Sequence, residues 1–409
     1  MANQDFQYII VGAGCAGLQL ARALLDLPDS GVSSILILES SQNHSEKSWC
    51  FWHEETHKYR HLVKKEWRNI AFNSSKNYVS SPLKNQTYQY INSIDFLNFH
   101  LEYFKKDGRV TVINDVVLSI SEQNNNCIAY CQNSVYTSSI IFNSIPQLNI
   151  NEVFKPKVWQ HFLGWEISTE SEIFDTDKVT LMDFEVDENT DSRFIYILPF
   201  SEKSALIECT VFSERILPVE SYEQSLKKYI EHHFGHKYSV ISKEKGAIPM
   251  HQIQTQSQWK KIIPIGTAAG CIKPSTGYSF RRNMENTERI INFLKDSSQV
   301  FPVKQRFTFY DSLLLWIISN NPAQIKKIFS YLFKHNSIDD ILLFLDEKTN
   351  IWQDIKLFLS LPKIPFLRAL FKLNTTNVVI LQNRELFTKF KQGVLLPSPN
   401  TEQLVEFEN

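Results

Sequence analysis

The chain has 409 residues, enough for roughly two to three domains and a substantial hydrophobic core. Its 43 Lys and Arg residues balance 44 Asp and Glu residues, and the formal net charge of -1 argues against a nucleic-acid-binding protein held by bulk charge. Apolar residues make up 43% of the chain, which excludes a disordered protein, and the 29 Phe residues suit a protein that handles a large apolar ligand.

A strand, a glycine-rich loop and a helix open the chain. Residues 7–11 (QYIIV) predict a buried strand, and LQLARALLDL after the loop has helical spacing. A second strand over residues 34–38 is followed by Glu39, whose carboxylate can accept hydrogen bonds from a ribose. The loop has the full G-x-G-x-x-G pattern, which lets the backbone and a helix N-terminus approach a pyrophosphate. We therefore predict a dinucleotide site that includes Glu39 and the loop residues Gly12, Gly14, Cys15, Ala16 and Gly17.

Extended segments dominate the middle of the chain. Residues 111–143 contain short β-rich runs separated by NNN and QNS, which suit an antiparallel meander. Residues 159–210 alternate apolar and polar residues and predict a separate antiparallel sheet, and a helix is expected over residues 221–233.

A second glycine-rich segment, PIGTAAGCIKPSTGY at residues 264–278, precedes a helix expected over residues 276–294. In flavoproteins such a distal element returns to hold the flavin, so this segment together with the N-terminal motif favours FAD over NAD. The alternative is a plain helix entry with a Ser or Thr cap. The residues expected to contact FAD here are Gly266, Thr267, Gly270, Pro274, Ser275, Thr276 and Gly277.

The C-terminal part predicts a helical bundle. Residues 307–372 are rich in Leu, Ile and Phe at helical spacing, and residues 326–372 carry eight Lys or Arg against five Asp or Glu. Such segments either lie on an anionic membrane surface or form a helical cap on the core. The longest apolar run, residues 313–318, is far shorter than the ~20 residues that a membrane-spanning helix needs. No secretory signal is visible, so we expect a cytoplasmic protein with reduced cysteines.

Three segments together resemble the FAD-dependent lycopene cyclases of carotenoid-making bacteria and, more distantly, of plants. They are KSWCFW at 47–52, ALIECTVFS at 205–213 and GTAAGCIKPSTGYSF at 266–280. The resemblance implies an α/β (α+β) fold with a Rossmann-like FAD domain of the flavoprotein hydroxylase type. It also implies an interleaved antiparallel-sheet substrate domain and a helical C-terminal region. We place the FAD domain at residues 1–150 plus 245–300, the substrate sheet at 151–244 and the helical region at 301–395.

The resemblance also implies the reaction, in which the acyclic ψ-ends of lycopene become β-ionone rings with no net redox change. FAD would act in its reduced form, because its negative charge near N1 stabilises a cation, and NAD(P)H would serve as reductant. Lycopene or a related acyclic carotenoid is then the substrate, and we expect contact with the inner face of the cell membrane but no obligate protein partner. Two departures from the family pattern stand out. Thr267 occupies the position where hydroxylase relatives usually carry Asp, and Glu208-Cys209-Thr210 keeps only the first of two adjacent acids found in plant cyclases.

Cyclisation needs a strong, dry acid that protonates the C1–C2 alkene. Glu208 is the predicted catalytic residue, because an apolar setting would raise its pKa and keep its carboxyl protonated. On spacing alone an ordinary strand carboxylate is the simpler interpretation, and the family resemblance reverses that preference. Reduced flavin could instead deliver the proton, with Glu208 as its electrostatic partner. Asp183 and Glu185 are weaker candidates for a base on one strand face.

Several aromatic and histidine side chains are weaker candidates for the site. Trp49, Phe51 and Trp52 line either the flavin or the core, because aromatic faces suit both. His53, His161 and His251 have no triad or metal partner in spacing, so no metal site is predicted. Two further functions remain open: an FAD-dependent monooxygenase or prenyl-chain reductase on the same fold, and a non-catalytic carrier of an apolar ligand.

Overall fold

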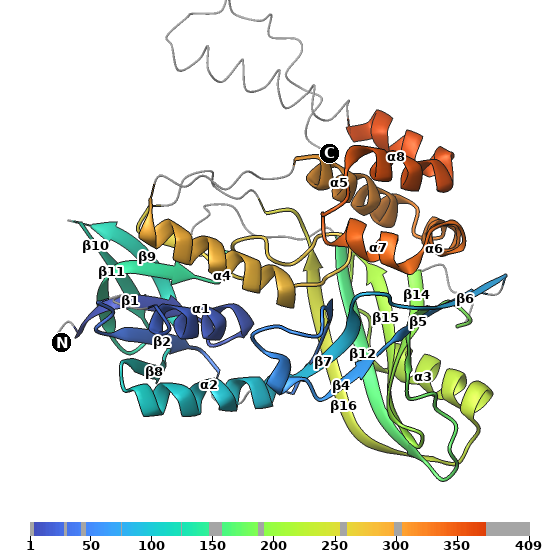
Figure 1. Cartoon of the computed structure of the whole chain (residues 1–409), viewed down its shortest axis with the longest axis horizontal. Coiled ribbons are helices and arrows are strands. Elements are labelled where there is room, and N and C mark those ends of the chain that lie inside the picture. Colours follow the sequence, from blue (N-terminus) through green and yellow to red (C-terminus); the bar gives the residue numbers. More distant parts are fainter. Residues whose placement is uncertain are drawn as a thin grey trace, which may run out of the picture. The chain divides into compact units, whose positions relative to one another are not determined.

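The strands of the described residues form three sheets in a computed structural model (Figure 1). The described residues are 4–27, 31–41, 46–74, 76–123, 125–146, 158–186, 192–253, 260–297 and 305–373. Residues 1–362 form one compact unit, and a second unit begins at Lys363, where residues 363–373 are helical.

The first sheet is mixed, and its parallel half is the predicted nucleotide-binding unit. Its spatial order is β8 (Val110–Asn114), β2 (Ile35–Glu39), β1 (Gln4–Val11), β11 (Val135–Asn143), β10 (Asn126–Cys131) and β9 (Val117–Gln123), with β17 (Ile262–Pro264) also pairing with β11. The pairs β8–β2, β2–β1, β1–β11 and β11–β17 are parallel, and β9–β10–β11 form an antiparallel meander. The predicted meander over 111–143 is therefore right for β9–β11, but β8 pairs in parallel with β2.

Continuous apolar runs explain why β1 and β2 are inner strands of this sheet, each with a neighbour on both sides. Ile10 and Ile37 pack on one face with helix α1 (Cys15–Leu25) and helix α4 (Phe280–Lys295), and both are fully buried. Ile9 and Leu36 point to the opposite face, which the meander covers. A strand buried on both faces has no solvated side, which is typical of parallel sheets.

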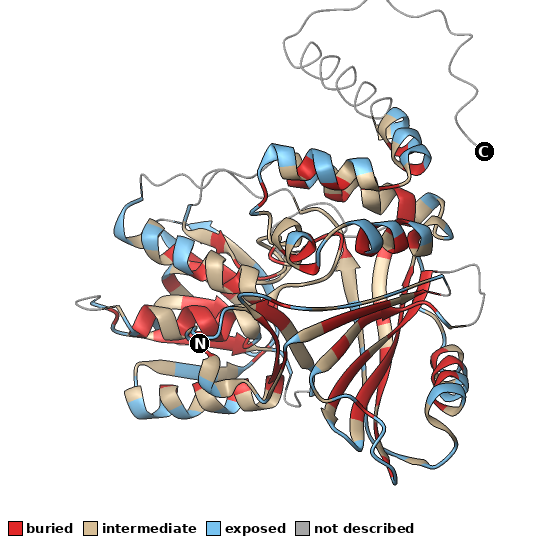
Figure 2. Ribbon diagram, turned by 45° about the vertical axis from the view of Figure 1, so that its right-hand side comes forward, coloured by how far each residue is buried: buried red, intermediate tan, exposed pale blue. Residues whose placement is uncertain are grey.

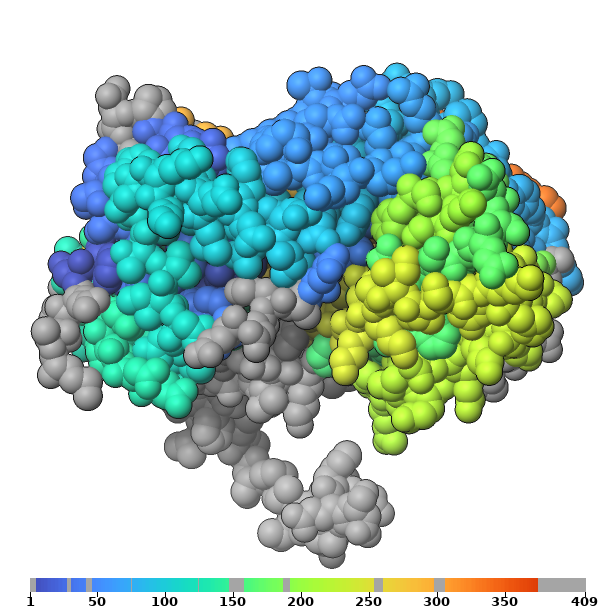
Figure 3. All heavy atoms as spheres, turned by 90° about the horizontal axis from the view of Figure 1, so that it is seen from below, coloured from blue at the N-terminus to red at the C-terminus, as the bar shows by residue number. Residues whose placement is uncertain are grey.

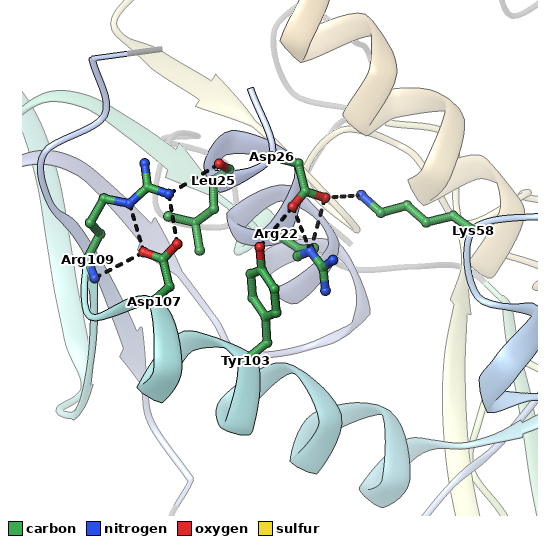
Figure 4. A network of polar contacts seen from close by, with 7 residues as sticks. All are labelled: Arg22, Leu25, Asp26, Lys58, Tyr103, Asp107 and Arg109. Carbon is green, nitrogen blue, oxygen red and sulfur yellow. Dashed lines mark hydrogen bonds and ion pairs between the residues drawn. The ribbon is translucent and has the colours of Figure 1, made fainter. Parts of the chain in front are cut away.

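Polar contacts fix α1 against helix α2 (Ser93–Asp107), as Figure 4 shows. The carboxylate of Asp26 accepts hydrogen bonds from Arg22 at 2.8 Å, Tyr103 at 3.1 Å and Lys58 at 3.2 Å. Arg109 binds the Asp107 carboxylate and donates to the Leu25 carbonyl, so the end of α2 is held to the end of α1. These contacts hold α1, the helix that follows the nucleotide-binding loop, against α2.

The second sheet is the predicted antiparallel sheet, and it is larger than predicted. Its order is β16 (Tyr238–Met250), β12 (Val158–Thr169), β15 (Ser204–Ser213), β14 (Ser192–Ser201), β13 (Lys178–Asp183), β5 (Asn69–Ser74) and β6 (Asn77–Pro82). All pairs are antiparallel except β13–β5. Helix α3 (Val219–Phe234) packs on one face, where Ile207, Cys209 and Val211 of β15 are buried (Figure 2).

This sheet corrects the predicted domain boundaries in two places. Strands β5 and β6 come from the stretch assigned to the FAD domain, yet they extend the second sheet beyond β13. The boundary expected at residue 244 falls inside β16, because β16 pairs with β12 from Tyr238 to Met250 without leaving the ladder. Seen from below, the N-terminal residues in dark blue and teal lie beside strands β12 to β16 of the second sheet, in green to yellow (Figure 3).

A small third sheet and four helices complete the first unit. The third sheet has the order β3 (Ser48–His53), β7 (Thr87–Asn92) and β4 (Lys65–Trp67), and a 3-10 helix spans Arg60–Leu62. The helices are α5 (Gln305–Asn320), α6 (Gln324–His335), α7 (Ile338–Leu345) and α8 (Ile351–Ser360), which agrees with the predicted helical region. The part of that region beyond residue 373 lies outside the described residues. No helix among the described residues is both long and apolar enough to cross a membrane.

Candidate functional site

The loop between β1 and α1 has the geometry that the glycine pattern predicts. A Cβ atom on Gly17 would lie 2.0 Å from the carbonyl oxygen of Gly12, so only glycine lets the helix approach the loop this closely. A Cβ atom on Gly14 would meet no atom within 4 Å, so this side of the loop is open to a ligand. No side-chain hydrogen bond caps the N-terminus of α1, which begins at Cys15, and its first N–H groups and positive dipole end suit an anion.

Glu39 lies at the end of β2, beside this loop. Its Oε2 atom accepts a hydrogen bond of 2.7 Å from the Ala13 N–H, and its Oε1 atom accepts one of 2.9 Å from the Ser41 N–H. The carboxylate is thus fixed at the mouth of the loop, where the sequence places a ribose acceptor.

The second glycine-rich segment meets the first, although about 250 residues separate them in the sequence. A Cβ atom on Gly266 would lie 3.1 Å from the Cβ atom of Ala16, and the Ala268 N–H donates to the Ser144 carbonyl at 3.3 Å. Thr267 accepts from the Gly270 N–H at 3.0 Å through its backbone carbonyl. The predicted FAD contacts of the two segments therefore converge.

The chain from Gly270 to Ser279 is a turn-rich loop and not the start of a helix. The predicted helix over 276–294 begins at Phe280, because the Lys273 carbonyl accepts the N–H groups of Thr276 and Gly277 and Gly277 has a φ of 77°. A φ in this region is strained for any residue with a side chain. The loop separates two cavities: Gly270 and Pro274 line one of about 180 Å³, and the next three residues, Ser275, Thr276 and Gly277, line one of about 350 Å³.

Two buried polar atoms in this loop region have no hydrogen-bond partner within the described residues. They are the Oγ1 atom of Thr276 and the Oε1 atom of Gln160, and both residues line the larger cavity. Buried polar groups are normally satisfied, so such atoms mark a place for a polar ligand edge. Together with the open side of Gly14 and the uncapped helix, they fit a long dinucleotide such as FAD. FAD would be held by Glu39, the first glycine loop and residues 266–277.

The larger cavity lies between the second sheet and the helices α6 and α7. The apolar residues of its sheet wall include Phe162, Leu181, Met182, Phe194 and Phe212, and its helical wall consists of Phe329, Leu332, Phe333, Ile341 and Leu345. A volume of about 350 Å³ is within the usual range of about 300–1,000 Å³ for small-molecule sites. The walls suit a hydrocarbon.

Glu208 points into this cavity from β15. Because side chains alternate along a strand, Glu208 and Thr210 line the cavity while Ile207 and Cys209 pack against α3. Glu208 is 8% exposed, and its Oε1 atom accepts a hydrogen bond of 2.6 Å from the Thr210 hydroxyl. Burial, and next the charge of Glu244, raise the pKa of Glu208 to about 8, so the carboxyl keeps its proton near neutral pH.

Glu244 on β16 is a second carboxyl in the same cavity, and sequence analysis missed it. Its Oε2 atom accepts hydrogen bonds from the Ser48 N–H at 3.1 Å and the Ser48 hydroxyl at 3.0 Å. Burial raises the pKa of Glu244 to about 7, against the opposing hydrogen bonds from Ser48. In the sequence Glu244 stands between Lys243 and Lys245, which is typical of a solvated strand. The only signal was that its strand, β16, is the next strand along the chain after the family segment at 205–213.

Three tyrosines also line the cavity and were not predicted. The Tyr88 hydroxyl lies 2.8 Å from the Tyr196 hydroxyl and 3.0 Å from the Tyr278 hydroxyl. Tyr196 is directly opposite Glu208 in the β14–β15 ladder. Burial raises the pKa of all three phenols, so they stay neutral and offer aromatic faces as well as hydrogen bonds.

The three aromatic candidates from the sequence do not all lie in one cavity. Trp49 lines the larger cavity, whereas Phe51 and Trp52 line the smaller one. The ring of Phe51 stacks on the ring of Phe280, with 4.4 Å between the ring centroids. The prediction that Asp183 and Glu185 share a strand face is wrong, because β13 ends at Asp183.

Asp183 and His161 make structural contacts away from the larger cavity's lining. Asp183 accepts hydrogen bonds from the Tyr229 hydroxyl at 2.6 Å and from Asn73 at 3.1 Å. His161 is buried between Ser213 and Tyr222. Among the described residues no group of His, Cys, Asp and Glu could hold a metal ion.

The family model described as lycopene cyclase protein matches residues 7–371 of this sequence. The chain belongs to the lycopene cyclase family. Two curated relatives are similar to parts of this lycopene cyclase family member. It is 30% identical to a chloroplastic neoxanthin synthase of Solanum tuberosum over 135 residues, which are 30% of this chain and 26% of that protein. It is 24% identical to the lycopene beta-cyclase of Pantoea ananas over 210 residues, which are 48% of this chain and 55% of that protein. The chain thus spans about a quarter and about half of the length of these relatives.

Solved structures show the fold of this lycopene cyclase family member. A geranylgeranyl bacteriochlorophyll reductase-like protein of Thermoplasma acidophilum has a TM-score of 0.59 and 13% identity, over 90% of this chain and 99% of that one. A halogenase solved in complex with phloroglucinol and FAD has a TM-score of 0.54 and 14% identity, over 87% and 82% of the two chains. The predicted α/β fold of the flavoprotein type is therefore confirmed.

Proposed function

We propose that this protein is an FAD-dependent lycopene β-cyclase, which converts the ψ-ends of lycopene into β-ionone rings without net redox change. The observation that carries the proposal is one apolar cavity whose lining includes both Glu208 and residues 275–277 of the loop assigned to FAD. A buried carboxyl with a raised pKa is an acid strong enough in context to protonate an alkene. The family membership and the resemblance to the Pantoea enzyme over half of the chain support a carotenoid substrate.

The cavity residues account for the steps of the reaction. Protonation of the C1–C2 alkene by Glu208 creates a tertiary cation, the C5–C6 alkene attacks it, and loss of the C6 proton gives the β-ring. Water would trap the cation as an alcohol, and the phenylalanine-rich walls keep water away from it. The faces of Tyr88 and Tyr196 can stabilise positive charge while their buried hydroxyls remain neutral.

FAD, when bound in its reduced form, supplies negative charge at the ring edge that stabilises a nearby cation, and NAD(P)H keeps it reduced. Four kinds of groups in this chain would hold FAD: the N-terminus of α1, Glu39, the loop at 266–270 and the loop at 274–277. The buried Thr276 hydroxyl provides a hydrogen-bonding group in the second loop.

A cytoplasmic enzyme bound to the inner face of the cell membrane is the localisation we propose. Helix α8 exposes Ile351, Trp352, Ile355 and Leu359, with Trp352 76% exposed, and Lys356 is exposed beside them. An apolar face edged by lysine suits an anionic lipid surface. Asn336, the residue after α6, donates a hydrogen bond of 2.9 Å to Ser360 at the end of α8. Because α6 forms one wall of the cavity, we propose that a hydrocarbon enters from lipid on this side.

Expression in a lycopene-accumulating bacterium tests the proposal. We expect cyclic pigment from the native chain, and only lycopene from Glu208→Gln. The matched control Glu202→Gln changes an exposed carboxyl in the turn of the same β14–β15 hairpin and should leave ring formation intact. The moles of NAD(P)H that the purified enzyme oxidises should be far fewer than the moles of rings that it forms. Stoichiometric NAD(P)H oxidation without rings would instead indicate the reductase or monooxygenase, and pigment binding without product would indicate a carrier.

A further inference from the structure

We propose that Glu244 is the base of the reaction: it accepts the proton that leaves C6 of the substrate, while Glu208 supplies the proton that enters. This inference rests on the proposed cyclisation. A cyclisation with no net redox change adds one proton and removes one proton at different carbon atoms. The cavity therefore needs a proton donor and a proton acceptor, and its lining contains two glutamates.

Gly164 on β12 brings the two carboxyl groups together. Strand β12 lies between β15 and β16, and Gly164 is directly opposite both Glu208 and Glu244. Residues directly opposite one another in a sheet point to the same face, so both side chains stand beside the position where Gly164 has none. A Cβ atom on Gly164 would lie 3.0 Å from Cδ1 of Leu206, 3.2 Å from Cγ of Glu244 and 3.6 Å from Cβ of Glu208. The missing side chain at Gly164 thus leaves space that the side chains of both glutamates and Leu206 border.

The two carboxyl groups have different surroundings, which assigns their roles. Glu244 receives two hydrogen bonds from Ser48 on one oxygen, and such bonds stabilise the charged form. Glu208 receives one, from Thr210, and is more deeply placed beside Tyr196. Glu244 therefore ionises first, and its negative charge is one reason why the pKa of Glu208 is raised. At neutral pH the pair holds an acid and a base side by side.

The proton balance closes within the pair. The Glu208 carboxyl gives its proton to C2, the bond between C1 and C6 forms, and the C6–H bond releases its proton to the Glu244 carboxylate. The substrate gains and loses one proton, and no electrons leave it. Return of a proton from Glu244 to Glu208 restores the starting state.

Several other titratable groups surround the pair and contribute to its pH response. Cys50 and Tyr278 lie near Glu208, and the charges of Glu46 and Glu166 act on Glu244. Lys47 and Lys245 also line the cavity.

The test compares the native enzyme with Glu244→Gln, Glu208→Gln and the control Glu202→Gln as purified, flavin-loaded proteins. We expect a bell-shaped dependence of ring formation on pH in the native enzyme, because the base must be ionised and the acid protonated. Glu244→Gln should lower the rate by roughly 100-fold and abolish the acidic limb. Because the base also selects the proton that is removed, this variant should form rings with double bonds in other positions beside the β-ring.

A second variant covers the case in which Glu244→Gln folds poorly. Ser48→Ala removes one donor to Glu244 and leaves the backbone N–H, so the acidic limb should move to higher pH while far-UV circular dichroism and flavin absorbance stay unchanged. A native enzyme that forms no rings would overturn the proposed function. A native enzyme that forms rings, with Glu244→Gln and Ser48→Ala matching it in rate, pH profile and ring type, would overturn only the role of Glu244.

Discussion

Lys273 Nζ lies 3.2 Å from Oδ2 of Asp311, and both side chains are buried. Lys273 also contacts Glu347 at 3.1 Å, and Glu347 in turn binds Arg282 at 2.7 Å. These ion pairs tie the loop assigned to FAD to α5 and to the turn after α7. They therefore position the loop between the two cavities.

Replacing this lysine should destabilise the protein. Lys273→Met leaves Asp311 and Glu347 without their shared buried cation, which typically costs about 3–5 kcal/mol. The control Lys243→Met removes an exposed pair with Glu223 and should cost less than about 1 kcal/mol. Urea denaturation measures the free energy of unfolding of both variants. Equal decreases in the two variants would show that the buried ion pairs stabilise the fold no more than the exposed pair does.

Glu208 should make the stability of the protein depend on pH. Its pKa is about 8 in the folded chain against an ordinary 4.5, so in the pH range between these values the unfolded chain loses a proton that the folded chain keeps. The contribution of Glu208 to the free energy of unfolding is therefore full below the lower value and is lost as pH rises through the higher one. The Glu208→Gln side chain cannot ionise, so this variant should have a larger free energy of unfolding than the native protein at about pH 8.5. At about pH 5 the difference between the two proteins should be smaller. Denaturant titrations at the two pH values check this, and a difference independent of pH would contradict it.

The glycines of the first loop should respond differently to alanine. Gly17→Ala places a Cβ atom 2.0 Å from the Gly12 carbonyl oxygen, and we expect a loss of at least about 1–3 kcal/mol in stability. Gly14→Ala meets no protein atom within 4 Å, so the chain should fold normally but bind FAD roughly tenfold more weakly, or about 1.4 kcal/mol. Thermal unfolding and flavin titration separate the two effects. Unchanged flavin affinity in Gly14→Ala would place the dinucleotide elsewhere.

Helix α8 should be needed for contact with lipid. Leu359 is 65% exposed, and burying a leucine in an apolar phase contributes about 1.5–3 kcal/mol, so Leu359→Ser should weaken binding to anionic vesicles roughly tenfold. Leu118 on β9 is 61% exposed on a different sheet, so Leu118→Ser serves as the control and should bind like the native protein. Vesicle flotation measures the bound fraction. Equal binding of both variants would remove α8 from the interface.

Local patterns predicted those parts of the site that lie within one stretch of chain. The glycine spacing from Gly12 to Gly17 and the acid at Glu39 follow from the requirements of a tight strand–loop–helix turn, and the structure has them as predicted. The two-residue period of a strand likewise requires Glu208 and Thr210 to share one face and Ile207 and Cys209 the other, and the structure has this arrangement.

Tertiary structure alone decided what lies beside those residues. Glu244, Tyr88 and Tyr278 belong to separate strands and loops, and no local pattern connects them with Glu208. The pairing of β12 with both β15 and β16 places Gly164 between two carboxyl groups, and that register depends on hydrogen bonds between distant segments. The sequence by itself thus determined the main local elements, the glycine loop with Glu39 and the candidate acid Glu208, but not Glu244 or the three tyrosines. The pKa of each carboxyl depends on burial and on neighbouring charge, and those exist only once the strands have paired.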